Sequence, residues 1–510
     1  MRRLPRPGTF LSRVGFNGLA QMAPIIVSLA LTPLLLTRLG LDRYGLWALA
    51  LIVVSTVTSL DGGVSASLAR FFAIHAARDD RADAGRLLFG SLLFFAVFGL
   101  VLTAGSLMLA PTLVDLLHIP ASLESEATWL FRWLPLLAIL ALAADAMGAL
   151  LQGNGQFREL AIATSASSGL FAVAVIVFVG SGAELPELYA CAALRYAGMA
   201  VAGLVLAWKR IAAQRPFLPS WATVREVAGY SSRMQVALMT GFVNAELDGF
   251  LIAAVAEVSY VGLYSIGLQA ASAARSVPLY AFSPLLTRLT TTFRHGGKAA
   301  ASAEFDLLEP RWLPSVLGYG ALSISAIGFS VTVWLGDDYV LSGVTAVVLL
   351  TGYIVHVGLT GMRTCYVRAI GRPGLEARYS TVWTISNAAL TVPLALVAGM
   401  IGVVSATAAT GILASAYFVV LCRRTERLPF LLPSRRSWVL AATAAVLTVL
   451  GELLVLGTDV HGFVGLVLTG VPPLVAVAIL LPFERHRFPV FQRPLPADNV
   501  DVTTARRDSA

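Results

Sequence analysis

Long runs of apolar residues, separated by short polar segments, dominate the chain. A run of about 18 or more apolar residues is long enough to cross the hydrocarbon core of a bilayer as a helix. The apolar–polar alternation typical of a membrane β-strand is absent from the sequence. The pattern therefore predicts an all-α polytopic membrane protein. We place about fourteen transmembrane helices at residues 14–37, 44–69, 87–110, 128–151, 160–180, 187–208, 227–250, 261–286, 312–336, 342–362, 379–398, 402–421, 437–457 and 463–483.

Composition supports the membrane class and excludes two others. Of the 510 residues, 57% are hydrophobic and only 13% are charged, whereas soluble domains are about a quarter charged. The net charge of +8 comes from basic residues in short loops rather than on one face, so we expect no nucleic-acid partner. Cys191, Cys365 and Cys422 fall within apolar runs and form no C-x-x-C pair, so no disulfide framework and no metal site are predicted.

The distribution of basic residues predicts the orientation. All but six of the 37 lysines and arginines lie at the ends of the chain or in segments expected on one side of the membrane. The positive-inside rule places that side, and both termini, in the cytoplasm. The basic start precedes an apolar run too long for a signal peptide, so we expect an uncleaved first helix. A twelve-helix alternative drops the last pair and keeps this orientation. The six exceptions are Arg38, Arg43, Arg132, Arg195, Arg233 and Arg275.

A weak internal repeat predicts two halves. "YGLWALA" at residues 44–50 aligns with "VGLYSIG" at 261–267, and "LQGNGQFRE" at 151–159 aligns with "AIGRPGLEA" at 369–377. The two offsets nearly agree and both pairs keep their polarity, which favours a parallel repeat of six helices around a central cleft, although chance similarity stays open. The expected units are an N-terminal half (14–210), a C-terminal half (225–424), an extra helix pair (437–483) and a disordered cytoplasmic tail (484–510).

A polar segment interrupts the first two apolar runs, at Arg38, Asp42, Arg43 and Tyr44. We interpret it as a tight outer turn that Gly40 and Gly45 permit, with Tyr44 at the membrane interface. Asp42 is expected to pair with Arg38 or Arg43. Direct contact between Arg38 and a substrate is the alternative.

Four segments together resemble the polysaccharide exporters of the multidrug/oligosaccharidyl-lipid/polysaccharide (MOP) superfamily, which include flippases for O-antigen, lipopolysaccharide and exopolysaccharide units. The segments are "TPLLLTRLGLDRYGLWAL", "LDGGVSASLARFFA", "LLQGNGQFRELA" and "ELDGFLIAAVAEVSYVGLYSIGLQ". The resemblance implies alternating-access transport of an undecaprenyl-diphosphate-linked oligosaccharide from the cytoplasmic to the periplasmic leaflet of the bacterial inner membrane. It also implies a monomer among membrane lipids that works with a polysaccharide polymerase and glycosyltransferases.

Arginines within apolar runs are the first candidate substrate contacts. A charge at such depth is costly and usually faces a cavity or a partner, and the planar guanidinium binds phosphate oxygens in pairs. Amides nearby can bind sugar hydroxyls, although they can equally join helices. The predicted cleft residues are Arg275, Arg233, Arg195, Arg132, Arg38, Asn17, Gln21 and Gln269.

Carboxylates within apolar runs are candidates for binding a coupling ion, either H⁺ or Na⁺. They are Asp61, Asp145, Glu246 and Asp248. For each of them a structural salt bridge or a helix-end role is the competing interpretation. No other cofactor is expected.

Three rival functions stay open. A cation-coupled drug exporter, or a lipid II flippase of the same superfamily, shares the fold class, but the deep arginine at 275 favours an anionic substrate over a cationic drug. An enzyme would need catalytic groups on sizeable loops, and the sequence has no such loop, nucleotide-binding glycine motif or paired catalytic carboxylates. A scaffold without transport activity is the third.

Overall fold

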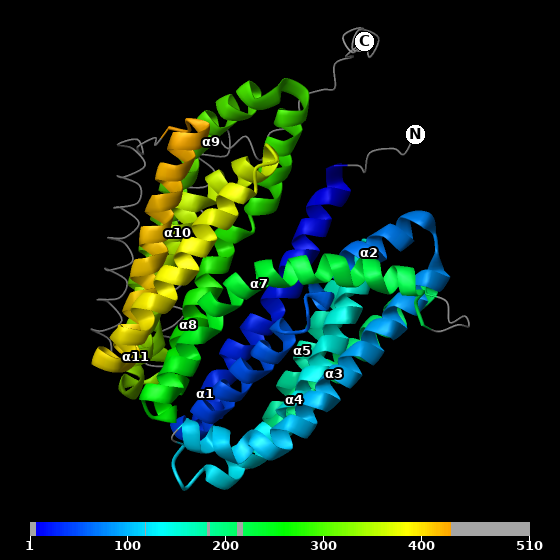
Figure 1. The fold of residues 1–510 in the computed structure, drawn as a ribbon. Coiled ribbons are helices and arrows are strands. Elements are labelled where there is room, and N and C mark those ends of the chain that lie inside the picture. The colour runs from blue at the N-terminus through cyan, green and yellow to red at the C-terminus, as the bar shows by residue number, and fades with distance from the viewer. Residues whose placement is uncertain (1–6, 118, 181–183, 212–217, 430–510) are drawn as a thin grey trace.

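The computed structural model describes residues 7–117, 119–180, 184–211 and 218–429, and within them every regular element is a helix (Figure 1). This confirms the all-α prediction. The elements are α1 (Pro7–Ser59), α2 (Val64–Arg78), α3 (Arg81–Leu116), α4 (Glu124–Gly153), α5 (Phe157–Phe178), α6 (Leu185–Ala207), η1 (Trp208–Arg210), α7 (Trp221–Val255), α8 (Val258–Leu279), α9 (Phe282–Leu335), η2 (Asp337–Tyr339), α10 (Val340–Ala369) and α11 (Gly374–Glu426).

Three of these helices fold back on themselves at a glycine. Gly40 in α1, Gly297 in α9 and Gly399 in α11 have positive φ angles that a continuous helix cannot contain. In α11 the Thr410 hydroxyl lies 3.0 Å from Oδ1 of Asn387, 23 residues earlier. A straight helix would separate these residues by about 35 Å. The two parts of α11 are therefore antiparallel neighbours.

The first twelve predicted helices all coincide with helical segments once α1 and α11 are divided at their glycines. Eight elements in the described part of the chain are long and apolar enough to span a membrane. Large apolar side chains such as Met108 (81% exposed) and Val397 (84% exposed) point outward, as expected for a surface that meets lipid rather than water. The chain is a multi-pass membrane protein. The predicted pair 437–483 and the tail lie outside the described residues.

Two details of the predicted helices were wrong. The helix expected at 44–69 is interrupted, because α1 ends at Ser59 and α2 begins at Val64. Gly62 and Gly63 between them both have positive φ, which ends the first helix and starts the second in a new direction. The segment before residue 312, expected as a loop, is also helical from Phe282 onward, and an ion pair between Arg288 and Glu304 joins the two sides of its Gly297 turn.

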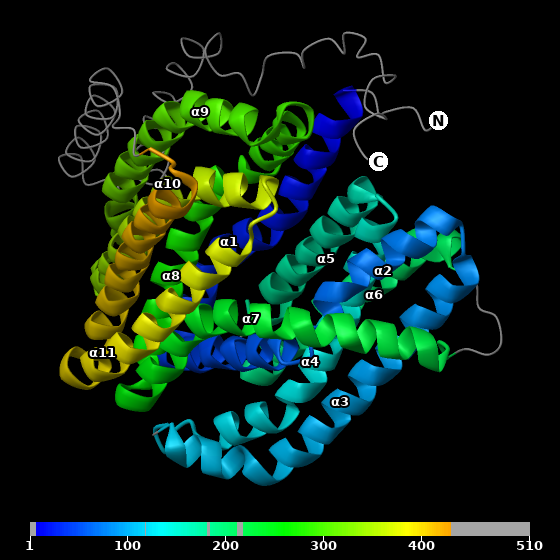
Figure 2. The ribbon, with the colours of Figure 1, turned by 45° about the horizontal axis from the view of Figure 1, so that its top comes forward.

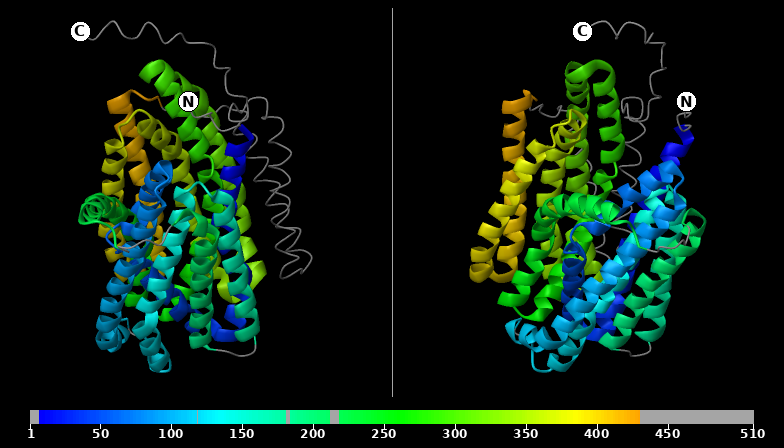
Figure 3. Two further views of the ribbon diagram at one scale, coloured as in Figure 1. Left: turned by 90° about the vertical axis from the view of Figure 1, so that its right-hand side faces the viewer. Right: turned by 45° about the vertical axis from the view of Figure 1, so that its right-hand side comes forward.

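The helices form an N-terminal group and a C-terminal group, with α7 running between them (Figures 1 and 2). In the N-terminal group α4 packs against α2, α3 and α6, while in the C-terminal group α10 packs against α8, α9 and α11. Part of α7 lies across the direction of most other helices (Figure 3). It contacts α1 and α2 on one side and α11 on the other. One element therefore contacts α2, which lines one of the polar sites described below, and α11, which contributes to the other.

The repeated sequence motifs meet where α1 packs on α8. Gly45 of "YGLWALA" and Gly262 of "VGLYSIG" are equivalent positions in the repeat. A Cβ on Gly262 would lie 3.2 Å from Cα of Gly45, and a Cβ on Gly45 would overlap the Val258 carbonyl. Small residues allow helix backbones to approach closely in membranes, where packing drives association. The repeat thus supplies a close backbone contact between α1 and α8.

Replacing Gly45 with alanine should destabilise the protein. The added methyl group overlaps the backbone of α8, and overpacking of this kind costs about 1–3 kcal/mol. Gly105→Ala in α3 is the matched control, because no atom lies within 4 Å of the added Cβ. Thermal unfolding of the detergent-solubilised protein, monitored by size-exclusion chromatography, should show a lower midpoint for Gly45→Ala alone. Equal midpoints for the two variants would contradict the close-packing argument.

Candidate functional site

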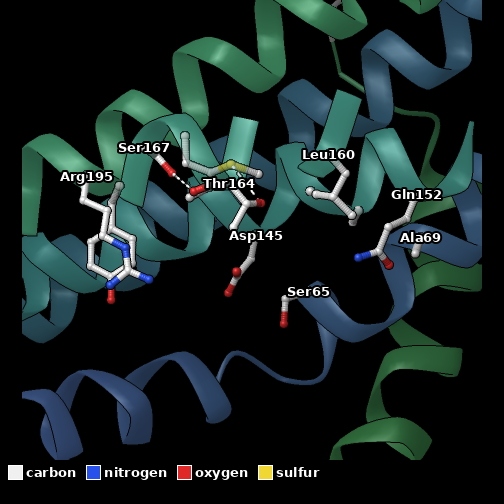
Figure 4. A pocket seen from close by; sticks show the side chains of 13 residues that line it. Ser65, Ala69, Asp145, Gln152, Leu160, Thr164, Ser167 and Arg195 are labelled. Atoms are coloured by element: carbon white, nitrogen blue, oxygen red, sulfur yellow. Dashed lines mark hydrogen bonds between the residues drawn. The ribbon is translucent and has the colours of Figure 1, made fainter. Parts of the chain in front are cut away.

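A polar cavity of about 420 Å³ opens within the N-terminal group, between α2, α4, α5 and α6 (Figure 4). This volume falls in the usual range for small-molecule sites, about 300–1,000 Å³. The lining residues are Ser65, Ala69, Ala144, Asp145, Gly148, Ala149, Gln152, Leu160, Thr164, Ser167, Arg195, Tyr196 and Met199. Two of the predicted site residues, Asp145 and Arg195, therefore share one cavity.

The two charges of this cavity are held on rigid helices. Asp145 is the accessible residue in a stretch of α4 whose neighbours Ala144 and Ala146 are buried. Arg195, on α6, lies over the rings of Phe171 and Tyr196, each 5.7 Å from its guanidinium carbon. These aromatic contacts fix the position of the cation without neutralising it. The cavity thus offers a cation and a carboxylate in a polar recess.

Uncharged polar groups complete the cavity. Gln152 contributes an amide from α4, and Ser65 contributes a hydroxyl from α2 (Figure 4). Ser167 donates its hydroxyl to the carbonyl of Thr164 at 3.0 Å, which leaves its oxygen able to accept. Amides and hydroxyls are suited to sugar hydroxyls, because each group can donate and accept hydrogen bonds.

Asp61, a predicted ion-coupling residue, caps α2. Its two carboxylate oxygens accept hydrogen bonds from the backbone N–H groups of Gly63 (2.9 Å) and Ser65 (2.7 Å). The residue is 1% exposed, and it is close enough to Asp145 to interact electrostatically. A carboxylate at a helix N-terminus satisfies orphan amides and complements the helix dipole. These contacts match the helix-end role that the sequence left open.

A second polar cluster is buried in the C-terminal group between α7, α8 and α11. Asp248 is 1% exposed, and its Oδ2 accepts hydrogen bonds from the hydroxyls of Thr407 (2.6 Å) and Tyr264 (3.4 Å). Thr407 also lies 3.3 Å from Oδ1 of Asn387, which accepts from Thr410 at 3.0 Å. The helix hairpin of α11 thus places Thr407 against the Asp248 carboxylate, and Asn387 of its other arm bonds to Thr410 beside Thr407.

This cluster leaves polar atoms unsatisfied. Oδ1 of Asp248 and Nδ2 of Asn387 are buried without a hydrogen-bond partner among the described residues. A buried carboxylate is costly to keep charged. It therefore favours binding a cation that compensates the charge, or taking up a proton that removes it. The arrangement can therefore take up a proton or a small hard cation, whose preferred ligands are oxygens. Sequence reasoning found Asp248 but missed Asn387, Thr407 and Thr410, since single amides and hydroxyls are common in membrane helices.

Arg275 occupies a third environment, next to aromatic residues. Its guanidinium carbon lies 4.3 Å from the centre of the Tyr353 ring, and its Nε is buried without a partner among the described residues. His356 is near enough to interact with its charge, and the His356 ring packs 4.6 Å from that of Trp383. Arg275 does not line the N-terminal cavity, so the structure places Arg195 and Arg275 in separate polar sites.

The remaining predicted residues are dispersed. Arg38 is exposed beside the Gly40 turn. Gln269 donates to the Ser28 hydroxyl at 2.9 Å, which joins α8 to α1. Glu246 accepts a hydrogen bond from the Ser55 hydroxyl at 2.6 Å.

Nε of Arg132 is buried without a partner in the described part of the chain. The side chains of Arg233, Asn17 and Gln21 lie outside the described set.

Two ion pairs differ from the sequence-based expectations. Asp42 was expected to pair with Arg38 or Arg43, but its side chain is exposed. Arg43 instead forms an ion pair with Glu126 of α4 at 2.6 Å. Arg363, counted among the loop cations, is buried in α10, where it pairs with Glu309 of α9. Neither acidic partner is near in sequence, so spacing alone could not identify it.

Comparison with solved structures defines the class. The fold is shared with an inward-facing multidrug resistance MATE family transporter of the MOP superfamily, at TM-score 0.61 and 13% identity over 81% of this chain and 95% of that chain. The lipid II flippase MurJ in an inward closed conformation matches at TM-score 0.69 and 14% identity, over 92% and 99% of the chains. The MATE multidrug transporter DinF-BH in complex with R6G matches at TM-score 0.59 and 15% identity, over 84% of this chain and 99% of that chain. The protein thus has the fold of the MOP-superfamily transporters.

The sequence then identifies the family. The family profile described as polysaccharide biosynthesis protein matches residues 35–291, about half of the chain. The chain belongs to this family. No curated protein matches the sequence. The profile covers the N-terminal cavity and the segment that carries Asp248, and it agrees with the resemblance seen in the sequence.

Replacing Thr407 with valine should destabilise the C-terminal cluster. Valine keeps the shape of threonine but removes the 2.6 Å hydrogen bond to Asp248, and an unsatisfied buried acceptor costs about 1–3 kcal/mol. Thr425→Val is the control, because the exposed Thr425 hydroxyl bonds only the carbonyl of Leu421 in its own helix. Thermal midpoints in detergent should fall more for Thr407→Val. A drop of the same size in both variants would argue against the cluster's role in stability.

Proposed function

We propose that the protein is a flippase for lipid-linked oligosaccharides, which moves undecaprenyl-diphosphate-linked polysaccharide units from the cytoplasmic to the periplasmic leaflet of the bacterial inner membrane. The observation that carries the proposal is the polar cavity with Arg195 and Asp145, inside a bundle whose outer surface is apolar. Membership of the polysaccharide biosynthesis family supports a glycan substrate. Both termini are cytoplasmic, and the protein acts without chemical catalysis as a monomer beside the polymerase and the glycosyltransferases.

The physical problem of such transport is the polar head of the substrate. Two phosphates and several sugars must cross about 30 Å of hydrocarbon, while the lipid tail can stay in the bilayer. In the proposed mechanism Arg195 binds the diphosphate through charge-assisted hydrogen bonds, and Gln152, Ser65 and Ser167 bind sugar hydroxyls. Alternating access, in which the two helix groups rock against each other, then exposes the head to the opposite side.

Two relatives in fold define the competing functions. The MATE structures are of multidrug transporters, and MurJ is a lipid II flippase. The in-bundle arginines at 195 and 275 favour an anionic substrate over a cationic drug. A lipid II flippase would meet the same diphosphate, so charge cannot separate the two flippase activities. The family match favours the polysaccharide unit.

The proposed energy source is a cation, H⁺ or Na⁺, that binds at Asp248. This carboxylate is buried with an unsatisfied oxygen, and the surrounding Thr407 and Asn387 supply further oxygens. Because α7 carries Asp248 and also contacts α2, a movement of α7 on neutralising the carboxylate would act on α2, a helix that lines the cavity. Cation binding and substrate movement would thereby be linked through one element.

Arg195→Ala should block export of the polysaccharide unit. Loss of charge-assisted hydrogen bonds of about 1.5–3 kcal/mol corresponds to roughly a 10- to 100-fold loss of substrate affinity. In a strain deleted for the gene, undecaprenyl-linked glycans measured by mass spectrometry should accumulate, and surface polymer should fall. Wild type should reverse both effects, Arg195→Lys should do so partly, and Arg195→Ala should not. Arg275→Ala tests the second arginine in the same strain.

The matched control is Arg158→Ala, an exposed arginine on α5 that does not line the cavity. Immunoblots of membrane fractions must show equal protein for all variants. Restoration by Arg195→Ala equal to wild type would remove the cavity from the mechanism. Normal polymer and normal lipid-linked pools in the deletion strain would overturn the flippase proposal itself and favour a small-molecule exporter.

Asp248→Asn should uncouple transport from the cation. The change preserves shape and removes the charge that attracts the ion. In membrane vesicles, export of fluorescently labelled lipid-linked glycan should respond to an imposed H⁺ or Na⁺ gradient with wild type and lose that response with Asp248→Asn. Glu246→Gln, on the same helix and bonded to Ser55, should keep it. A preserved response in Asp248→Asn, or its loss only in Glu246→Gln, would move the coupling site away from Asp248.

A further inference from the structure

Three potential metal ligands converge at the turn between α2 and α3, away from both polar sites. His75 lies in the last turn of α2, Asp80 caps α3 and Asp83 lies in its first turn. One ligand atom from each side chain lies within 4.8 Å of the other two. The spacing H-x₄-D-x₂-D is not a recognised metal motif, so sequence reasoning did not identify it. The turn from helix to helix creates the convergence.

His75 is the observation that distinguishes this cluster from ordinary helix capping. The residue is only 8% exposed, and its Nδ1 is buried without a hydrogen-bond partner among the described residues. Leaving a buried polar atom unsatisfied costs about 1–3 kcal/mol. A capping role explains the two carboxylates but provides no reason to bury a polar imidazole beside them.

Hydrogen bonds hold both carboxylates in place. Oδ1 of Asp80 accepts the backbone N–H of Asp83 at 3.0 Å, and Oδ1 of Asp83 accepts from Arg86 at 2.6 Å. Hydrogen bonds of this kind to ligating carboxylates fix their orientation, as is usual around metal ions.

The geometry points to a binding site for a divalent transition-metal ion, best suited to Zn²⁺, formed by His75, Asp80 and Asp83. A cation between the side chains would take an imidazole nitrogen as a ligand and would add to Arg86 in offsetting the charge of the two neighbouring carboxylates. One imidazole with two carboxylates suits Zn²⁺ more than Mg²⁺ or Ca²⁺, which prefer oxygen ligands alone. Three protein ligands leave one tetrahedral position for water.

Such an ion would fasten the end of α2 to the start of α3. The other end of α2 carries Ser65, which lines the N-terminal cavity, and Ser67, which bonds Ser231 of α7 at 2.7 Å. Metal occupancy would therefore restrict the movement of a helix that touches both the cavity and α7. The site needs neither the proposed substrate nor the proposed coupling ion, so its test is independent of both.

The test measures Zn²⁺ binding by the full-length protein, purified in detergent without a histidine tag and stripped of metal with a chelator. Isothermal titration with ZnCl₂ should give one site that is lost or at least about tenfold weaker in His75→Ala and in Asp83→Asn. Co²⁺ in place of Zn²⁺ should produce visible d–d absorption in wild type only. MgCl₂ should compete weakly.

His295→Ala is the matched control, because the exposed His295 lies on α9 and bonds only the Thr291 carbonyl among described contacts. It should bind Zn²⁺ as wild type does. Thermal midpoints in excess chelator must agree between wild type and the variants, so that a loss of binding is not a loss of fold. Absence of Zn²⁺ binding by wild type, or equal affinity in wild type and His75→Ala, would overturn the site and leave helix capping as its only role.

Discussion

The close approach of α1 and α8 at Gly45 and Gly262 is the contact on which the rest of the structure depends. These glycines are equivalent in the internal repeat, and each occupies a place where a side chain would collide with the other helix. Because hydrophobic burial contributes little to helix association inside a bilayer, tight backbone packing must supply the attraction. The helices on either side can then differ in sequence and still pack around the same central pair.

The second constraint is that charges inside the bundle need partners. The structure meets it in several ways: Asp61 binds backbone amides, Arg363 pairs with Glu309, and Arg195 and Arg275 lie against aromatic rings. Asp145 and Asp248 are two carboxylates that depart from this pattern, the first by facing a cavity and the second by keeping an unsatisfied oxygen. Incomplete satisfaction of a buried charge is expensive. These two carboxylates are consequently the residues for which a ligand gives the simplest explanation.

Much of the fold could be predicted from the sequence, because membrane helices are specified by the length of their apolar runs. The positions of the breaks were harder to predict. Gly62 and Gly63 interrupt a run that reads as one helix, and α9 includes residues 287–311, which look polar enough for a loop. For the sites, spacing identified the charged residues but not their partners. Contacts such as Arg43 with Glu126 and Asp248 with Thr407 join residues far apart in the chain, and a single sequence carries no record of them.

The separation of the two polar sites has a mechanical consequence. The N-terminal cavity is lined by α2, α4, α5 and α6, whereas the Asp248 cluster is formed by α7, α8 and α11. One contact joins the two regions: α7 carries Asp248, and its Ser231 bonds Ser67 of α2, the helix whose Ser65 lines the cavity. Gly63 brings α2 close enough for this contact, because a Cβ there would overlap the Ser231 carbonyl. A shift of α7 would therefore act first on α2, the helix that carries Ser65 into the cavity wall.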